Sequence, residues 1–242
     1  MDIVKTEFDN YAKGYSGGME DPLKRMVGKD LEAFLRIKAE DLLRTICRKE
    51  CSVRDTKIVL LDFGCGQGDF LRILRELGSD ADLEGCDISE GMLEEAKKKW
   101  TSGSAPVFFK TNYGEAPSPR EKYDVIVIVS VLHHVPPEKR QKLLSDVSLS
   151  LKKGGLLAVF EHNPYNPLTS IVVKRAAIDK NAVMLTGSEC AELMSSAGLK
   201  HERTNYILFF PLWKWAEGFR KIEPLLWWLP VGGQYCVYAK KP

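Results

Sequence analysis

Residues 59–70 read VLLDFGCGQGDF, and this stretch decides the fold of the chain. An apolar run leads directly into three glycines within five residues and then into a segment with helical spacing of its apolar residues. That order predicts a buried strand, a tight turn and the start of a helix. Because glycine permits positive φ and close approach of the backbone, the turn predicts a ligand lying against main-chain N–H groups.

The chemistry of that ligand is indicated by Asp62, two residues before the first glycine. Glycine turns between a strand and a helix often bind the pyrophosphate of a dinucleotide. A carboxylate at the end of the strand would repel those phosphates, but it would attract an ammonium group and a sulfonium centre. S-adenosylmethionine carries both cations. The spacing G-x-G-x-G in place of G-x-G-x-x-G also disfavours a nicotinamide-dependent oxidoreductase.

A second acid stands at the end of the next predicted strand. Residues 83–88 read LEGCDI, and Asp87 follows the glycines by roughly 20 residues, the spacing at which such folds hold a ribose diol. The alternative is a plain helix-cap or turn aspartate. The glycine turn at that spacing favours the ribose contact.

Further motifs follow in a recognisable order. They are LDFGCGQG at 61–68, CDISEGML at 86–93, YDVI at 123–126, SVLHHV at 130–135 and LKKGGLL at 151–157. Together they resemble the successive motifs of class I S-adenosylmethionine-dependent methyltransferases, and an ordered set is far more specific than a lone glycine motif. The resemblance implies an α/β, Rossmann-like three-layer sandwich with a seven-stranded, mostly parallel sheet and an antiparallel last strand. It also implies S-adenosyl-L-methionine as cofactor and methyl transfer as the reaction.

The hydrophobic patterns alternate between strands and helices, as parallel βαβ units require. Strands are predicted near 57–63, 82–87, 106–111, 123–130, 156–162, 203–210 and 233–240, and helices near 30–50, 68–78, 89–100 and 138–151. One more helix is predicted from a capping box at Thr186 and Glu189 to Gly198. We expect a single methyltransferase domain over 1–242, with an N-terminal helical lid at 1–50 and a helical insertion at 211–230.

Parallel sheets bind ligands beyond the carboxyl ends of their strands. We therefore expect the cofactor to contact Tyr11, Asp62, Gly64, Cys65, Gly66, Asp87, Ile88, Met92, Asn112, Tyr113 and Ser130. Asp62 would bind the methionine ammonium, while the turn N–H groups and the helix after Gly68 would accept the carboxylate. Ile88 and Met92 would enclose the adenine, although both equally suit the core. Many relatives carry an acid where Asn112 stands, and the amide oxygen of Asn112 can still accept a hydrogen bond from adenine.

The catalytic candidates are His134 and Tyr15. The loop containing His134 resembles that of phosphoethanolamine methyltransferases, in which a histidine pairs with a tyrosine of an N-terminal lid. The resemblance implies that Tyr11 or Tyr15 covers the cofactor and that His134 removes or orients the acceptor's proton. Glu161 and His162 are alternative bases, and a loop histidine bonded to backbone is the structural alternative. No metal site is expected, because the histidines are adjacent or isolated instead of spaced to converge on one ion.

Two segments bear on the acceptor. Residues 163–167 read NPYNP at a strand exit and either shape the acceptor pocket or form ordinary turns. Residues 209–230 hold four of the five tryptophans and alternate apolar with charged residues. They suit a helix packed on the sheet edge, a greasy acceptor pocket or a membrane surface. We expect methylation at oxygen or nitrogen of a small, hydrophobic or lipid-linked acceptor; a non-catalytic cofactor-binding or partner-binding module is the alternative.

Composition limits the remaining options. The chain has 242 residues, of which 44% are hydrophobic, and 35 basic against 33 acidic residues leave a formal charge of +2. No overall electrostatic footprint for nucleic acid is therefore present. The six cysteines show no zinc or disulfide spacing, which favours reduced thiols. No signal peptide or spanning segment is evident, so we expect a cytoplasmic protein, with peripheral membrane contact through 211–230 as the one exception.

Overall fold

The computed structural model describes residues 31–49, 57–100, 104–112, 120–176, 179, 181–211 and 216–242. The strands are β1 (Val59–Phe63), β2 (Asp82–Asp87), β3 (Val107–Lys110), β4 (Tyr123–Val129), β5 (Leu151–His162), β6 (Lys200–Ile207) and β7 (Gln234–Lys240). The α-helices are α3 (Leu31–Lys49), α4 (Asp69–Glu76), α5 (Glu90–Lys99), α6 (Pro137–Ser150), α7 (Pro167–Arg175), α8 (Gly187–Ser196) and α9 (Glu217–Arg220). Short 3₁₀ turns are η1 (Leu132–His134) and η4 (Glu223–Leu225).

The strands form one seven-stranded sheet in the order β3-β2-β1-β4-β5-β7-β6. β1 pairs in parallel with both β2 and β4, and β7 is antiparallel to its neighbours β5 and β6. The expected Rossmann-like sheet with an antiparallel last strand is therefore confirmed. Because β1 is central, the residues at its carboxyl end lie beside the ends of two other strands.

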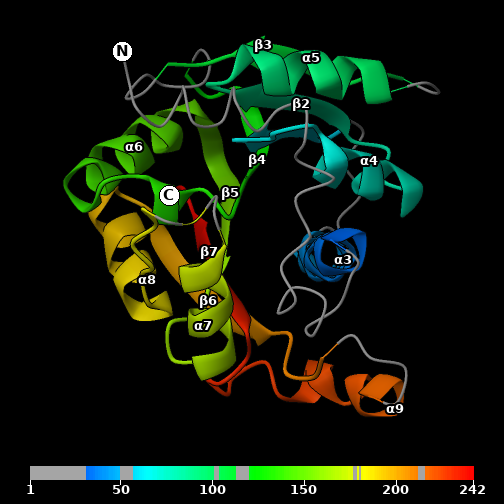
Figure 1. Ribbon diagram of the computed structural model, residues 1–242. Coiled ribbons are helices and arrows are strands. Elements are labelled where there is room, and N and C mark those ends of the chain that lie inside the picture. The colour runs from blue at the N-terminus through cyan, green and yellow to red at the C-terminus, as the bar shows by residue number, and fades with distance from the viewer. Residues whose placement is uncertain are drawn as a thin grey trace.

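Helices cover both faces of the sheet, and alternation along the strands divides the core in two. Leu61, Ile126 and Ile128 face the layer that contains α6 and α8, while Leu60 and Val125 face α3 and α4. Figure 1 shows α6 and α8 on one side of the sheet and α3 and α4 on the other. A side-chain period of two with both faces apolar is the pattern of a parallel sheet buried on both sides.

Helix α3 is held by its apolar face and by polar contacts of the half-buried Asp41. Ala39 and Leu42 are fully buried in the core on that side of the sheet. On the same helix the Asp41 carboxylate accepts hydrogen bonds from Tyr238 Oη at 2.7 Å and from Asn205 Nδ2 at 3.1 Å. The helix is thereby fixed against β6 and β7, although it precedes the sheet in the chain.

The NPYNP segment serves as a structural clasp, which favours the turn interpretation. Asn163 donates through Nδ2 to the carbonyls of Pro230 and Gly232, and the side chain of Asn166 caps α7 by accepting from Thr169 N. Helix α7 was not expected from the sequence. It begins at Pro167, where a fixed φ and a missing N–H suit a first helical turn.

The insertion between β6 and β7 is less helical than expected. Within its described part, α9 spans four residues and η4 three. The insertion starts at the same edge of the sheet as α7, because β6 runs in the same direction as β5 (Figure 1). Of the helices that the structure describes, none combines the length and apolarity needed to span a membrane.

Candidate functional site

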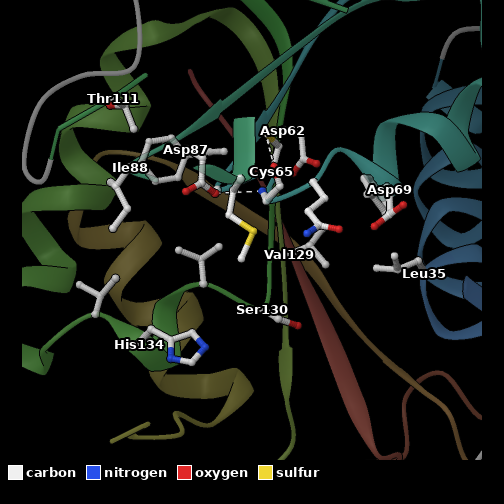
Figure 2. Close-up of a pocket in the computed structure, with 18 of the residues that line it drawn as sticks. Leu35, Asp62, Cys65, Asp69, Asp87, Ile88, Thr111, Val129, Ser130 and His134 are labelled. Atoms are coloured by element: carbon white, nitrogen blue, oxygen red, sulfur yellow. Dashed lines mark hydrogen bonds between the residues drawn. The ribbon is translucent and has the colours of Figure 1, made fainter. Parts of the chain in front are cut away.

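A cavity opens beyond the carboxyl ends of β1, β2 and β4 (Figure 2). Its lining includes the expected residues Asp62, Gly64, Cys65, Gly66, Asp87, Ile88, Met92, Asn112, Ser130 and His134. It also includes Leu35, Lys38 and Thr111, which the sequence did not single out. Tyr11, Tyr15 and Tyr113 lie outside the described residues. The strand ends thus gather the expected side chains around one space.

Of the glycines in this turn, Gly64 is packed tightly against a neighbouring side chain, and Gly66 faces empty space. Gly64 has φ +78°, and a Cβ there would lie 2.5 Å from Val131 Cγ2. Gly66 has φ +50°, yet a Cβ there would meet nothing within 4 Å. Glycine is needed at Gly64 for packing, whereas at Gly66 the empty space is where a ligand can approach the backbone.

Most N–H groups of this turn are already engaged within the protein. The N–H groups of Gly64 and Cys65 both donate to Cys86 O, and Gly68 N donates to Cys65 O. Gly66 N donates to Asp87 Oδ2 at 2.9 Å, and Ser89 N donates to Oδ1 of the same carboxylate. Asp87 therefore braces the turn, as the simpler interpretation expected, and also lines the cavity.

Asp62 is a buried acid that lines the cavity. It is 1% exposed, and its Oδ1 is buried without a hydrogen-bond partner among the described residues. Burial, together with the nearby Asp87, raises the pKa of Asp62 to about 8, although the Lys38 ammonium opposes this rise. An unpartnered buried carboxylate facing a cavity is costly unless a ligand supplies a donor. A ligand ammonium is the group that fits this position.

Lys38 enters the same cavity from α3. It is 3% exposed, and its Nζ donates to Ser130 Oγ at 3.3 Å. Burial lowers its pKa to about 8, while the carboxylates of Glu161 and Asp62 act in the opposite direction. One signal in the sequence could have found it: Lys38 stands between Leu35 and Leu42 on the apolar face of the helix, where a charge is otherwise out of place.

The remaining expected residues also line the cavity. Met92 is 2% exposed and packs in the lining beside Ile88, and Asn112 follows β3. Ser130 directly follows β4 and lies in the left-handed region, at φ +56°. Thr111 precedes Asn112, and its buried Oγ1 has no hydrogen-bond partner among the described residues. Thr111 is thus a second buried polar group that a ligand could satisfy.

A histidine cluster borders the cavity. Glu161 is fully buried; its Oε1 accepts from Leu132 N and its Oε2 lies 2.6 Å from His133 Nδ1. Burial alone would lower the pKa of His133, but Glu161 and Asp179 raise it to about 9. Burial also opposes ionisation of Glu161, and the His133 charge nevertheless lowers its pKa to about 2. His133 and Glu161 therefore form a buried ion pair.

His134 lies next to this pair and lines the cavity, whereas Glu161 and His162 do not. The rings of His133 and His134 are 4.1 Å apart between centroids. Burial and the His133 charge lower the pKa of His134 to about 4, so His134 is neutral at physiological pH. Among the alternatives for a base, the geometry favours His134.

Asp179 joins the two histidines and had no signal in the sequence. Its Oδ1 lies 3.5 Å from Nε2 of His133 and 3.5 Å from Nε2 of His134. These three ligand-type atoms lie within 4.8 Å of one another, a grouping that the spacing of histidines along the chain did not predict. Burial of His133 between Glu161 and Asp179 accounts for the cluster through ion pairing.

Comparisons with known proteins agree with this geometry. A family model described as a methyltransferase domain matches residues 60–155. A carboxy-S-adenosyl-L-methionine synthase of Campylobacter hominis is 24% identical over 182 residues, which are 66% of this chain and 74% of that protein. A tRNA N(3)-cytidine methyltransferase METTL2 of Danio rerio is 27% identical over 157 residues, which are 58% of this chain and 44% of that protein. The match thus spans less than half the length of the second relative.

Solved structures share the fold over the whole chain. One is the magnesium protoporphyrin IX methyltransferase of Synechocystis with bound S-adenosylmethionine. It has a TM-score of 0.64 and 18% identity, and the alignment covers 100% of this chain and 99% of that one. At this identity the likeness concerns the fold.

The His133–Glu161 pair predicts a pH dependence of stability. The pKa of His133 rises on folding, so its contribution is complete below about pH 6.5 and is lost as pH increases through about 9. We expect the difference in unfolding free energy between wild type and His133→Gln to be about 1–3 kcal/mol near pH 6 and to shrink by pH 9.5. Urea unfolding at several pH values measures it.

The exposed His201 provides a control for this measurement. His201→Gln should leave the pH dependence of unfolding unchanged. A difference between wild type and His133→Gln that stays constant from pH 6 to 9.5 would contradict the buried ion pair.

Proposed function

The chain belongs to the class I S-adenosylmethionine-dependent methyltransferases, and on that premise we propose that it methylates an oxygen or nitrogen atom of a small, hydrophobic acceptor. The observation that carries the proposal is Asp62: a buried carboxylate with one oxygen that lacks a partner among the described residues, beside a glycine turn whose Gly66 faces open space. S-adenosylmethionine, when bound, supplies an electrophilic methyl group on a sulfonium centre.

We assign the donor site as follows. Asp62 holds the methionine ammonium, and Asp87, whose carboxylate lines the cavity, accepts from the ribose hydroxyls. Met92 and Ile88 enclose the adenine, and Asn112 contacts its edge. Gly64, Cys65, Gly66 and Ser130 complete the lining, and Tyr11 and Tyr113 stay predictions outside the described residues.

We assign proton transfer to His134. Its neutral imidazole lines the cavity, and the Asp179 carboxylate near Nε2 can orient it. A base must be unprotonated at working pH and within reach of the acceptor, and the low pKa of His134 meets the first condition. The sequence resemblance pairs this histidine with Tyr15, which lies outside the described residues.

The hydrophobic character of the acceptor is supported by the insertion between β6 and β7. Its described part exposes six large apolar side chains: Phe219, Ile222, Leu225, Trp227, Trp228 and Val231. The insertion leaves the sheet at the edge where the cavity opens. Adjacent exposed tryptophans suit an interface with one apolar and one wet side, such as a membrane surface from which a lipid-linked acceptor is drawn.

Donor binding can be tested by calorimetry with S-adenosylmethionine and NADH. We expect wild type to bind S-adenosylmethionine and not NADH. Asp62→Asn should weaken S-adenosylmethionine binding by at least about tenfold, because the amide cannot pair with the ammonium. Since the pKa of Asp62 without ligand is about 8, affinity should also increase as pH is raised from 6 to 8.

Asp69→Asn is the matched control, because Asp69 lines the same cavity while its carboxylate is paired with Lys99 Nζ at 3.0 Å. Its affinity should stay within about threefold of wild type. Binding of NADH in place of S-adenosylmethionine would refute the proposed function.

The role of His134 can be tested by turnover, measured as S-adenosylhomocysteine release with a panel of phenols and amines. For any acceptor that is methylated, His134→Ala should lower kcat by about 10²- to 10⁴-fold without loss of S-adenosylmethionine binding. His201→Ala, an exposed histidine, should not change kcat. Turnover of His134→Ala within about twofold of wild type at saturating acceptor would exclude the base role.

The interface role of the insertion can be tested by sedimentation with anionic phospholipid vesicles. Wild type should co-sediment, and Trp227→Ala/Trp228→Ala should reduce the bound fraction severalfold, because the apolar anchors are removed. Val107→Ala is the control, since Val107 is equally exposed on β3 at the opposite edge of the sheet. Failure of wild type to bind vesicles would remove the membrane contact and leave a soluble apolar acceptor.

A further inference from the structure

The methyl donor of the proposed function, on which this inference rests, carries an α-carboxylate as well as an α-ammonium group. In an α-amino acid the ammonium and the carboxylate are attached to the same carbon. If Asp62 binds the ammonium, the carboxylate must lie within a few ångströms of it, inside the same cavity. A buried carboxylate needs donors or a cation to offset its desolvation.

The glycine turn is poorly placed to supply those donors. The N–H groups of Gly64, Cys65, Gly66 and Gly68 already donate to Cys86 O, Asp87 Oδ2 and Cys65 O. The first turn of α4 carries Asp69, whose carboxylate already lies at this helix N-terminus and is paired with Lys99 Nζ. These four N–H groups of the expected carboxylate site are therefore already engaged within the protein.

Lys38 offers what the turn lacks. Its ammonium lines the cavity, interacts electrostatically with Asp62 and is 3% exposed. Among the described residues, Nζ donates to Ser130 Oγ at 3.3 Å, and an ammonium has three N–H groups. The remaining donor capacity is thus close to the acid that receives the ligand's ammonium.

We propose that Lys38 binds the α-carboxylate of the methyl donor, so that Asp62 and Lys38 together form a site for a zwitterionic amino-acid head group. The site then distinguishes donors that keep this carboxylate from donors that have lost it. Helix α3 precedes the residues matched by the family model, so this specificity comes from outside that matched region.

A purely structural role is the competing explanation, because Lys38 also interacts with the buried Glu161. The two explanations differ in what Lys38 senses. A structural lysine would affect all ligands of the cavity alike. A carboxylate-binding lysine would affect only the ligands that carry that carboxylate.

The test is calorimetric binding to wild type, Lys38→Met and Lys38→Arg of three ligands: S-adenosylmethionine, S-adenosylhomocysteine and the decarboxylated analogue of S-adenosylmethionine. We expect Lys38→Met to weaken the first two by about 10- to 100-fold and to leave the decarboxylated analogue within about threefold of its wild-type affinity. Lys38→Arg should recover most of the loss. Methionine matches the length of lysine, and thermal unfolding of each variant confirms folding.

The controls separate this inference from the proposed function. Asp62→Asn should weaken all three ligands, because each keeps the ammonium. Equal losses of all three ligands in Lys38→Met, or no loss at all, would overturn the assignment of Lys38 while leaving the donor site intact. Absence of S-adenosylmethionine binding in wild type would instead refute the proposed function itself.

Discussion

The buried carboxyl group of Asp62, at the carboxyl end of β1, is the constraint on which the rest of the site depends. Asp62 is held in the middle of a sheet covered on both faces, with one oxygen unpartnered among the described residues. Desolvating a carboxylate costs free energy that neighbouring donors usually offset. Here Asp87 increases the cost and Lys38 reduces it, and with burial the net effect raises the pKa of Asp62 to about 8.

A second pair of balanced buried charges lies at the end of β5. Glu161 at the end of β5 is balanced by His133, and that positive charge in turn keeps His134 neutral. The carboxyl groups of Asp62 and Glu161 are linked electrostatically through Lys38, which interacts with both.

The sheet was largely predictable because its signal is local. Alternating apolar segments, glycine turns and the capping box at Thr186 each identify an element from its own residues. Helix α7 was missed because two Asn-Pro pairs indicate turns as readily as a helix start. The site was predictable where motifs carry it, as at Asp62 and Asp87. Lys38 was missed although its charge on the apolar face of α3 was a signal, and Asp179 was missed because only tertiary contacts bring it to His133 and His134.

Most of the site residues that could be predicted and those that were missed lie in different parts of the chain. The glycine turn, Asp87 and the loop with His134 lie within the segment that the family model matches, whereas Lys38, Glu161 and the apolar insertion lie outside it. α3 is fixed to β6 and β7 by Asp41, and the NPYNP clasp fixes the end of the insertion to the exit of β5. The elements outside the matched segment are thus anchored to β5, β6 and β7. From there α3 extends to the cavity at the carboxyl ends of β1, β2 and β4. A change in α3 or in the insertion can therefore alter which ligands are accepted while the central strands and the glycine turn keep their structure.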